Sequence, residues 1–566
     1  MILIRLTVLL SGLVLLVPAP SAAEGDGLRE QLRQRLEQLH ETGMVRVADS
    51  TLLAPGPLQT LYEANAWQPL WFADEQALEQ LFRVPTTLDL AAAHGLDPGH
   101  YHQQTLADAL KRTSDHPNRT QARVDAELLA TDALLSLAHH LAHGRIDPET
   151  IDPEWFIKRD EPALEESAIR HALGGKNGRE LLESLLPTHP AYHRLVKQLA
   201  LKRAMAANGE WLTVEPGLPL IRPGQSDERI PTIRRQLARL ENLTDPAGDS
   251  AAEDYDDRLA DAVRRFQRRH GLATDGIIGP QTLAALNVTP AERVEQLRAN
   301  LERWRWLPQS LGDEYVLVNI AGFGMQVISG GQEVIRQRVI VGQPYRRTPV
   351  FTGHMSYLVL NPSWEVPHRL AVQDQLPRIR TNPDYLDDMG FAVLQGWGAE
   401  ERRIDPADVD WANLSRRHFP YRLRQAPGPD NALGRVKFMF PNRHNVYLHD
   451  TPARNLFKQD ERAFSSGCIR LEDAEELTRW LLVRRSDLMS EERIESVWEH
   501  GRETTIRFDR HLPVYLLYWT AWVGDDEQIH FRRDIYQRDQ RLIEALNTPP
   551  PISETPNTDL TREFDA

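Results

Sequence analysis

The chain has 566 residues, of which 41% are apolar and 26% are charged, and its formal net charge is −15. This composition is that of a globular protein of about three or four domains, which excludes a fibrous or largely disordered chain. No basic surplus is present to neutralise phosphates, so nucleic acid is excluded as the main partner. Cys468 is the only cysteine, which rules out an internal disulfide and a multi-thiolate zinc site.

The first 23 residues have the pattern of a signal peptide. Arg5 precedes an apolar run of twelve residues, 6–17, which is shorter than the roughly 20 residues that a membrane-spanning helix needs. Small residues follow at 21–23, as signal peptidase requires. We therefore expect an exported protein with no transmembrane segment after cleavage; the alternative is an uncleaved membrane anchor. Because exported proteins usually pair their cysteines or lack them, an unpaired one is a candidate reactive thiol.

Residues 24–225 are predicted to form a helical scaffold domain. Leucines recur there at helical spacing, and 124–143 is a further amphipathic run. Within that run His139 and His143 are four residues apart, a spacing that can hold a metal. No third ligand is evident, so we expect no metal site, and a zinc peptidase is the weakest hypothesis.

Residues 226–290 are predicted to form a small module of three helices. A proline- and glycine-rich segment at 209–228 separates the module from the scaffold. The order AVRRFQRRHGLATDGIIGPQTLAALN resembles the peptidoglycan-binding module, and the alternative is an unspecialised helical bundle.

Residues 291–540 are predicted to form a β-rich domain, which makes the whole chain a multidomain α+β protein. A helix is expected at 291–305, and a disordered tail at 541–566. The stretch 362–432 is too long for a loop between strands of one sheet, so it is expected to be a lid or subdomain. Apolar and β-branched stretches, with the turn Gly330-Gly331 between two of them, predict strands at 315–320, 325–329, 334–341, 350–361, 436–440, 445–449, 514–523 and 528–533, and helices at 472–483 and 490–500.

The lone cysteine lies in a segment suited to a nucleophile. Gly467 permits a tight turn beside Cys468. The helix predicted to begin a few residues later is expected to point its positive end at this loop and to favour the thiolate. A thiol nucleophile also needs a base, and His449, nineteen residues upstream, is the best candidate.

The predicted strand 445–449 places that histidine on an exposed face. Side chains alternate along a strand, so Asn445, Tyr447 and His449 share one face. The aliphatic residues at 446 and 448 share the other, which we expect to face the core. His444 falls outside the catalytic face and ranks below His449.

These residues resemble a known family. His449-Asp450-Thr451, followed by Ser465-Ser466-Gly467-Cys468-Ile469-Arg470, resembles the signature of the YkuD-like L,D-transpeptidase catalytic domain. The resemblance extends over about 315–535 and includes Asn361-Pro362-x-Trp364. With the scaffold and the module, the chain resembles the large YcbB-type L,D-transpeptidases of Gram-negative bacteria. The commoner family pattern has histidine before Gly-Cys, where this chain has Ser466, and the YcbB-type enzymes also carry serine there. His449 is therefore the motif's only candidate base.

The resemblance implies a cofactor-free acyl transfer between peptidoglycan stem peptides that forms 3–3 cross-links. Cys468 would be the nucleophile and His449 the general base and acid. Gly467 and Tyr447 would stabilise the oxyanion, and Asp450 would be a possible orienter of the histidine.

The resemblance also implies a substrate site. Arg470 would hold a substrate carboxylate, with a salt bridge to Glu472 or Asp473 as the alternative, and Ser466 and Trp364 would contact substrate. The stretch 362–432 would be a capping subdomain whose aromatic residues either close over the donor peptide or form their own small core: Trp364, Trp397, Trp411 and Tyr421.

The expected setting is the periplasm, with stem peptides as donor and acceptor, penicillin-binding proteins as possible partners, and carbapenems as covalent inhibitors. Three alternatives stay open. The same site would serve an L,D-carboxypeptidase or a hydrolase that detaches a protein from the wall. A non-catalytic peptidoglycan-binding scaffold is the alternative from another class.

Overall fold

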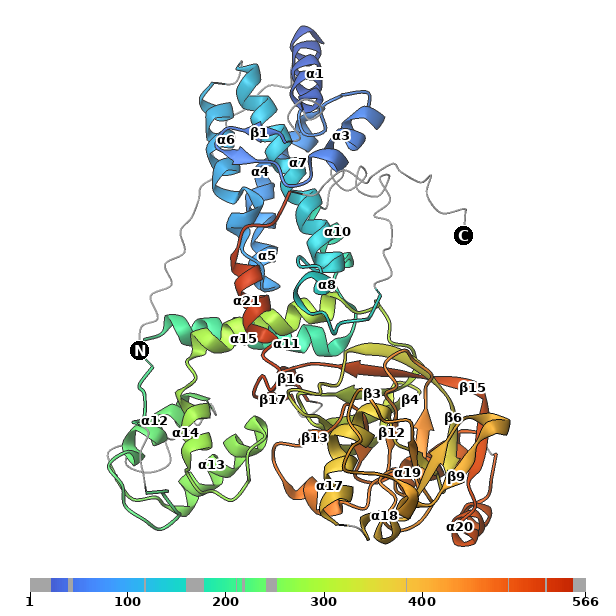
Figure 1. Cartoon of the computed structure of the whole chain (residues 1–566). Coiled ribbons are helices and arrows are strands. Elements are labelled where there is room, and N and C mark those ends of the chain that lie inside the picture. Colours follow the sequence, from blue (N-terminus) through green and yellow to red (C-terminus); the bar gives the residue numbers. More distant parts are fainter. Residues whose placement is uncertain are drawn as a thin grey trace.

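The computed structural model describes residues 22–38, 44–116, 119–158, 178–209, 211–215, 219–240, 252–382, 384–486, 488–524 and 527–552. The predicted signal peptide lies outside these ranges except for Ala22 and Ala23, which open helix α1. A helical domain stands above a β-rich domain, and a small helical module lies beside the latter (Figure 1). Among the described residues no helix is long and apolar enough to cross a membrane.

The helical domain is built around α7 (Thr120–His143), which is buried along most of its length. A helix buried in this way needs neighbours on every side, and shorter helices supply them. Two buried carboxylates of α7 bind loop backbone: Asp132 accepts from the N–H groups of Leu53 and Ala54, and Glu127 from that of Leu70. The surrounding elements are α1 (Ala22–Glu37), α3 (Pro55–Ala64), α4 (Glu75–Thr87), α5 (Asp89–Ala93), η1 (Pro98–Tyr101), α6 (Gln103–Asp115), α8 (Pro148–Ile151), α10 (Gly178–Ser184), and the pair β1 (Arg46–Val47) and β2 (Ser50–Thr51).

Two helices from the C-terminal half of the chain complete this domain and correct its predicted boundaries. Helix α15 (Pro290–Arg305) packs against α11 (Pro190–Ala207) rather than simply opening the β-rich domain. Helix α21 (Asp539–Asn547) packs on α15, so the disorder predicted from 541 onward is wrong for its first residues. Its Leu542 and Leu546 are fully buried, because spacing of four places both on one helix face. Residues 553–566 lie outside the described ranges.

The predicted three-helix module is confirmed. It consists of α12 (Ile230–Leu240), α13 (Asp257–His270) and α14 (Pro280–Asn287), with a core separate from the rest of the protein. Its N-terminal edge begins earlier than residue 226, because Ile221 forms a β-bridge with Ile278. The side chain of Arg532 fills the space beside Gly271 and donates to the Arg269 carbonyl at 2.9 Å, which joins the module to the β-rich domain.

The β-rich domain contains a nine-stranded sheet in the order β13-β5-β14-β12-β11-β6-β15-β3-β4. A further pairing between β4 and β5 closes the sheet on itself. The buried aliphatic residues of the sheet form one core with those of the helical domain. The Gly330-Gly331 turn joins β4 to β5 as predicted. The strands are β3 (Glu314–Asn319), β4 (Gly324–Ser329), β5 (Gln332–Gly342), β6 (Phe351–Leu360), β11 (Val436–Met439), β12 (Leu448–His449), β13 (Ala463–Ser465), β14 (Ile469–Leu471) and β15 (Thr504–Leu517).

Helices and a hairpin complete this domain. The predicted helix at 472–483 is α19 (Ala474–Arg479) continued by the π-helix η6 (Trp480–Arg485), and that at 490–500 is α20 (Glu491–His500). Strands β16 (Ala521–Val523) and β17 (Ile529–Phe531) form the last hairpin.

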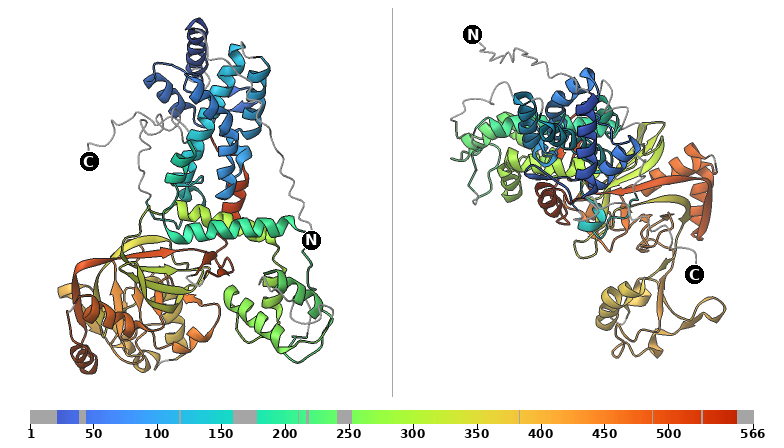
Figure 2. Two further views of the ribbon diagram at one scale, coloured as in Figure 1. Left: turned by 180° about the vertical axis from the view of Figure 1, so that it is seen from behind. Right: turned by 90° about the horizontal axis from the view of Figure 1, so that it is seen from above.

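The stretch 362–432 folds as a separate subdomain, here called the cap. Its four-stranded sheet has the order β7-β10-β8-β9, and its apolar residues form a core of their own. The cap projects from the rest of the β-rich domain (Figure 2, right). Its elements are β7 (Trp364–Glu365), α16 (His368–Leu370), η2 (Ala371–Gln375), α17 (Leu376–Thr381), α18 (Tyr385–Asp388), β8 (Phe391–Gln395), η3 (Gly398–Glu400), β9 (Arg402–Ile404), η4 (Pro406–Asp408) and β10 (Arg422–Gln425).

Candidate active site

The site is built on two short parallel strands. Strand β12 pairs with β14 so that Leu448 lies opposite Ile469 and His449 opposite Arg470. Both Leu448 and Ile469 are fully buried, so His449 and Arg470 share the other face, because side chains alternate along a strand. One step earlier in the register, Tyr447 and Cys468 meet on that same face, where Tyr447 hydrogen-bonds to the thiol. Tyr447 and His449 thus share one face as predicted, and Cys468 and Arg470 lie on it as well.

The segment before β12 differs from the expected strand. Asn445 has a φ of +54°, which is the left-handed region and breaks a strand. Its side chain therefore does not continue the alternation that was predicted for 445–449. Its carbonyl oxygen instead lies 3.7 Å from the Cys468 Sγ and accepts from the thiol.

A dense hydrogen-bond network fixes the turn that carries the nucleophile. Gly467 has a φ of +120°, which a residue with a Cβ adopts only under strain. Its N–H donates to the Ser465 Oγ at 3.1 Å, and that hydroxyl donates to the Cys468 carbonyl at 2.5 Å. The Gly467 carbonyl accepts from the Thr348 Oγ1 at 2.8 Å. Because its N–H is already engaged, Gly467 does not serve as the expected oxyanion donor in this conformation.

His449 is held in one orientation by a backbone carbonyl. Its Nδ1 lies 2.5 Å from the carbonyl oxygen of Asp450, which assigns the Nδ1 proton to this bond and leaves Nε2 as the basic nitrogen. The Asp450 side chain instead accepts from the Arg435 N–H at 2.8 Å and from Arg454 at 2.6 Å. Asp450 therefore orients the histidine through its backbone carbonyl, while its carboxylate binds elsewhere.

Burial keeps both reacting groups neutral. Burial, and next the charge of Arg470, lower the pKa of His449 to about 3. Burial also raises the pKa of the Cys468 thiol, although hydrogen bonds from the backbone and hydroxyl of Tyr447 and the charge of Arg470 act in the opposite direction. The site is therefore suited to general-base catalysis, in which the proton leaves the thiol as sulfur attacks.

The helix expected to stabilise the thiolate does not contact the thiol. Strand β14 separates Cys468 from α19, and three strand residues span about 10 Å. The Asp473 side chain also caps this helix, accepting from the Glu476 N–H at 2.9 Å. This separation argues against the predicted dipole effect, because the effect falls off within the first turn of a helix. The sequence pattern did not show the short strand β14.

Arg470 forms neither of the salt bridges considered as alternatives. Glu472 pairs with Arg338, and Asp473 caps α19. The Arg470 Nε is buried without a hydrogen-bond partner among the described residues. A buried guanidinium that lacks its hydrogen bonds favours an incoming carboxylate, which it can bind with paired bonds.

A cavity of about 650 Å³ lies over these residues. The catalytic face forms one wall, and cap residues including Trp364, Arg378 and Tyr385 form another. Trp364 also donates a hydrogen bond to the Tyr447 hydroxyl, so its predicted place at the site is supported. Trp411 and Tyr421 pack instead against the core of the cap. Trp397 is 69% exposed with Arg422 over its ring at 3.4 Å.

A charged bridge that the sequence analysis missed joins the nucleophile turn to the cap. Arg346 donates to the Ser466 Oγ at 2.9 Å and forms two bonds with Asp374 of the cap, at 2.6 and 2.7 Å. Ser466 also lines the cavity itself. The sequence gives no local signal for this pairing, because 28 residues separate Arg346 from Asp374.

The two scaffold histidines have no metal-site geometry around them. The rings of His139 and His143 lie 4.8 Å apart on α7. Within the described part of the chain, no group of three or more potential ligands is arranged to hold a metal ion.

Comparison with known proteins divides the chain into the same parts. Residues 56–199 match the model of a "Scaffold domain", 226–286 that of a "Putative peptidoglycan binding domain", and 313–495 that of the YkuD "L,D-transpeptidase catalytic domain". The chain therefore carries an L,D-transpeptidase catalytic domain together with a peptidoglycan-binding domain and a scaffold domain, which confirms the resemblance drawn from the motifs.

A curated protein of Haemophilus influenzae, named "Putative L,D-transpeptidase", is 36% identical over 248 residues, or 44% of this chain. The aligned region spans about half of that relative, 49% of its length.

Two solved structures are more distant. An L,D-transpeptidase from Mycobacterium smegmatis is 12% identical over 36% of this chain and 58% of its own, with a TM-score of 0.17. One from Xylanimonas cellulosilytica is 14% identical over 54% of this chain and all of its own, with a TM-score of 0.16.

Proposed function

We propose that this chain, through its L,D-transpeptidase catalytic domain, forms 3–3 cross-links between peptidoglycan stem peptides by way of a thioester on Cys468. One observation carries the proposal. Tyr447, His449, Cys468 and Arg470 share one face of a parallel strand pair, beneath a cavity that residues of a separately folded cap line on another side.

In the first half of the reaction, the Cys468 sulfur attacks the carbonyl of the third residue of a donor tetrapeptide while the thiol proton passes to Nε2 of His449. The carbonyl oxygen becomes an oxyanion, for which the backbone N–H of Cys468 and the Tyr447 hydroxyl are the nearest donors. When the intermediate collapses, the bond to the terminal D-alanine breaks and His449 returns the proton to the leaving amine. The product is a thioester, and Arg470 would hold a carboxylate of the donor.

In the second half, the amine of an acceptor stem peptide attacks the thioester. His449 takes the proton of that amine, the carbon–sulfur bond breaks, and the proton passes from His449 to the departing sulfur, which restores the Cys468 thiol. The cap supports transfer over hydrolysis, since a thioester kept from bulk water survives until an amine arrives. Hydrolysis by the same site, as in an L,D-carboxypeptidase or a hydrolase that detaches wall proteins, is the second candidate, because both reactions use the same cysteine and histidine.

The other parts of the chain support a role at the cell wall. A peptidoglycan-binding module beside the catalytic domain would concentrate the enzyme on its polymer. An exported, periplasmic protein with a cleaved signal peptide is the expected form, with donor and acceptor stem peptides as partners and penicillin-binding proteins as a further proposed partner. Carbapenems are proposed to acylate Cys468.

Product analysis separates the candidates. Incubation of the mature protein with disaccharide-tetrapeptide should give, by mass spectrometry, a dimer that lacks one D-alanine. Tripeptide alone would establish the hydrolase instead. If no product forms, the non-catalytic peptidoglycan-binding scaffold is the remaining candidate function. The Cys468→Ala variant is the matched control and should yield nothing.

A further inference from the structure

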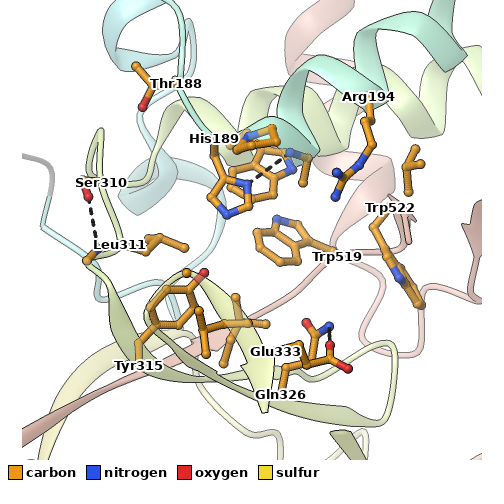
Figure 3. Close-up of a pocket in the computed structure, with 18 of the residues that line it drawn as sticks. Thr188, His189, Arg194, Ser310, Leu311, Tyr315, Gln326, Glu333, Trp519 and Trp522 are labelled. Atoms are coloured by element: carbon orange, nitrogen blue, oxygen red, sulfur yellow. Dashed lines mark hydrogen bonds between the residues drawn. The ribbon is translucent and has the colours of Figure 1, made fainter. Parts of the chain in front are cut away.

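A second cavity, of about 510 Å³, lies where the helical domain meets the β-rich domain (Figure 3). The N-terminal end of α11 and the end of α15 form one side, and β3, β4, the start of β5 and the β16 hairpin form the other. Its volume is within the range of small-molecule sites. It is distinct from the active site, because the two cavities share no lining residue. Arg336 of the second cavity and Gln343 of the active site are seven residues apart, or about 23 Å along an extended strand.

Aromatic rings form a rigid wall of this second cavity. His189 stacks on Trp304 at 4.7 Å between ring centroids, and Trp304 stacks on Trp519 at 4.4 Å. Trp522 and Tyr315 also line the cavity. Trp522 is only half-buried, and in Figure 3 it stands on the opposite side of Trp519 from His189. Trp304 and Trp519 are buried, so the half-buried Trp522, which also stacks on His530 at 5.3 Å, is the ring most open to a ligand. A ring fixed in this way offers apolar surface at little entropic cost.

Planar polar groups stand beside the rings. Gln326 of β4 donates to Glu333 of β5, and Arg336 donates to the same carboxylate at 2.7 and 2.5 Å. Arg194 reaches in from α11 on the facing side (Figure 3). The cavity therefore combines fixed amide, carboxylate and guanidinium groups with aromatic surface, and two domains supply them.

We propose that this second cavity binds a glycan, namely an oligomer of N-acetylated aminosugar such as the glycan strand of peptidoglycan. Sugars present apolar C–H faces, which pack on aromatic rings, and a rim of hydroxyl and acetamido groups, which planar donors and acceptors bind. The choice of an N-acetylated aminosugar rests on the proposed function, in which peptidoglycan is the substrate.

Two other occupants are an extended peptide and a simple anion. An extended peptide usually binds by adding a strand to a free sheet edge. Strands β3 and β4 are paired on both sides, but β5 has a second strand partner only from Val339 onward, so the displacement experiment below tests a peptide directly. A simple anion would face the carboxylate of Glu333, whose charge opposes it.

Calorimetric titration of the full chain with chitotetraose, the tetramer of N-acetylglucosamine, tests the proposal. The probe carries no peptide, so the result does not depend on transpeptidation. Saturable binding is expected, and Trp522→Ala and Gln326→Ala should each weaken it at least tenfold. Trp397→Ala, which removes an exposed tryptophan of the cap, is the matched control and should bind as the wild type does. The melting temperature of each variant shows whether it is folded.

Three outcomes would overturn the proposal. The first is no binding of chitotetraose by the folded wild type. The second is binding that persists in both cavity variants but is lost in a variant of the module such as Gln281→Ala, which would place the glycan on α14. The third is displacement of chitotetraose by a free stem tetrapeptide, which would show that the cavity is a peptide site.

Discussion

The neutral state of the cysteine and histidine predicts an unusual pH dependence of thiol alkylation. Burial holds the thiol pKa of Cys468 above its ordinary value of 9.0 and lowers the pKa of His449 to about 3. At pH 7, less than about 1% of the thiol is then thiolate, and about one histidine in ten thousand is protonated. A thiolate–imidazolium pair is therefore essentially unpopulated at neutral pH.

The assay uses iodoacetamide and intact-mass detection from pH 5 to pH 10. Since Cys468 is the only cysteine of the chain, the added mass reports on this one thiol. The rate should rise about tenfold for each pH unit up to pH 9, because only the thiolate reacts. Tyr447→Phe removes a hydrogen bond that favours the thiolate, and such a bond contributes about 1.5–3 kcal/mol. The variant should therefore react about tenfold or more slowly at pH 8.

His449→Gln is the control, since it removes the imidazole and should leave the slope of the pH profile unchanged. A rate that is level between pH 5 and pH 8 in the wild type, and that falls in His449→Gln, would show a preformed ion pair. That result would refute the reasoning from burial.

Three further substitutions test individual parts of the site. Arg470→Met should lower kcat/KM for the tetrapeptide by a factor of about 30 or more, because losing one partner of a buried charge pair costs about 2–5 kcal/mol; an unchanged value would exclude carboxylate binding by Arg470. Gly434→Ala should lower the melting temperature and slow acylation. Gly434 has a φ of +59°, and a Cβ there would overlap the Asp450 carboxylate, which costs about 1–3 kcal/mol of strain. A wild-type melting temperature together with a wild-type acylation rate would contradict this prediction. Arg346→Ala should raise the ratio of hydrolysis to transfer by freeing the cap, and Asp374→Asn should have the same effect. The double variant should show no larger effect than either single variant; additive effects would show that the two residues act separately.

The local part of the site was predictable from sequence. Alternation along a strand placed Tyr447 and His449 on one face, and the β12–β14 pairing brings Cys468 to that face. The module helices followed from their apolar spacing in the same way. These signals are local, so one segment of sequence contains them.

The remaining features are either details of local backbone conformation or contacts between distant segments. The Asn445 backbone leaves the strand conformation, and the N–H of Gly467 is taken by Ser465. The bridge from Arg346 to the cap also joins segments far apart in sequence. Leu542 of helix α21 packs on a core formed by other helices, and the local sequence did not show which surface would receive that apolar face. A pattern within a segment cannot show which distant segment will satisfy a donor or cover an apolar face.

The most direct test of the central claim is the intact mass of the protein after brief mixing with a donor tetrapeptide and no acceptor. The account predicts an adduct equal to the donor minus D-alanine, located on Cys468 by peptide mapping and absent from Cys468→Ala. Release of D-alanine with no such adduct at the earliest times, or with the adduct on another residue, would contradict a thioester mechanism at Cys468.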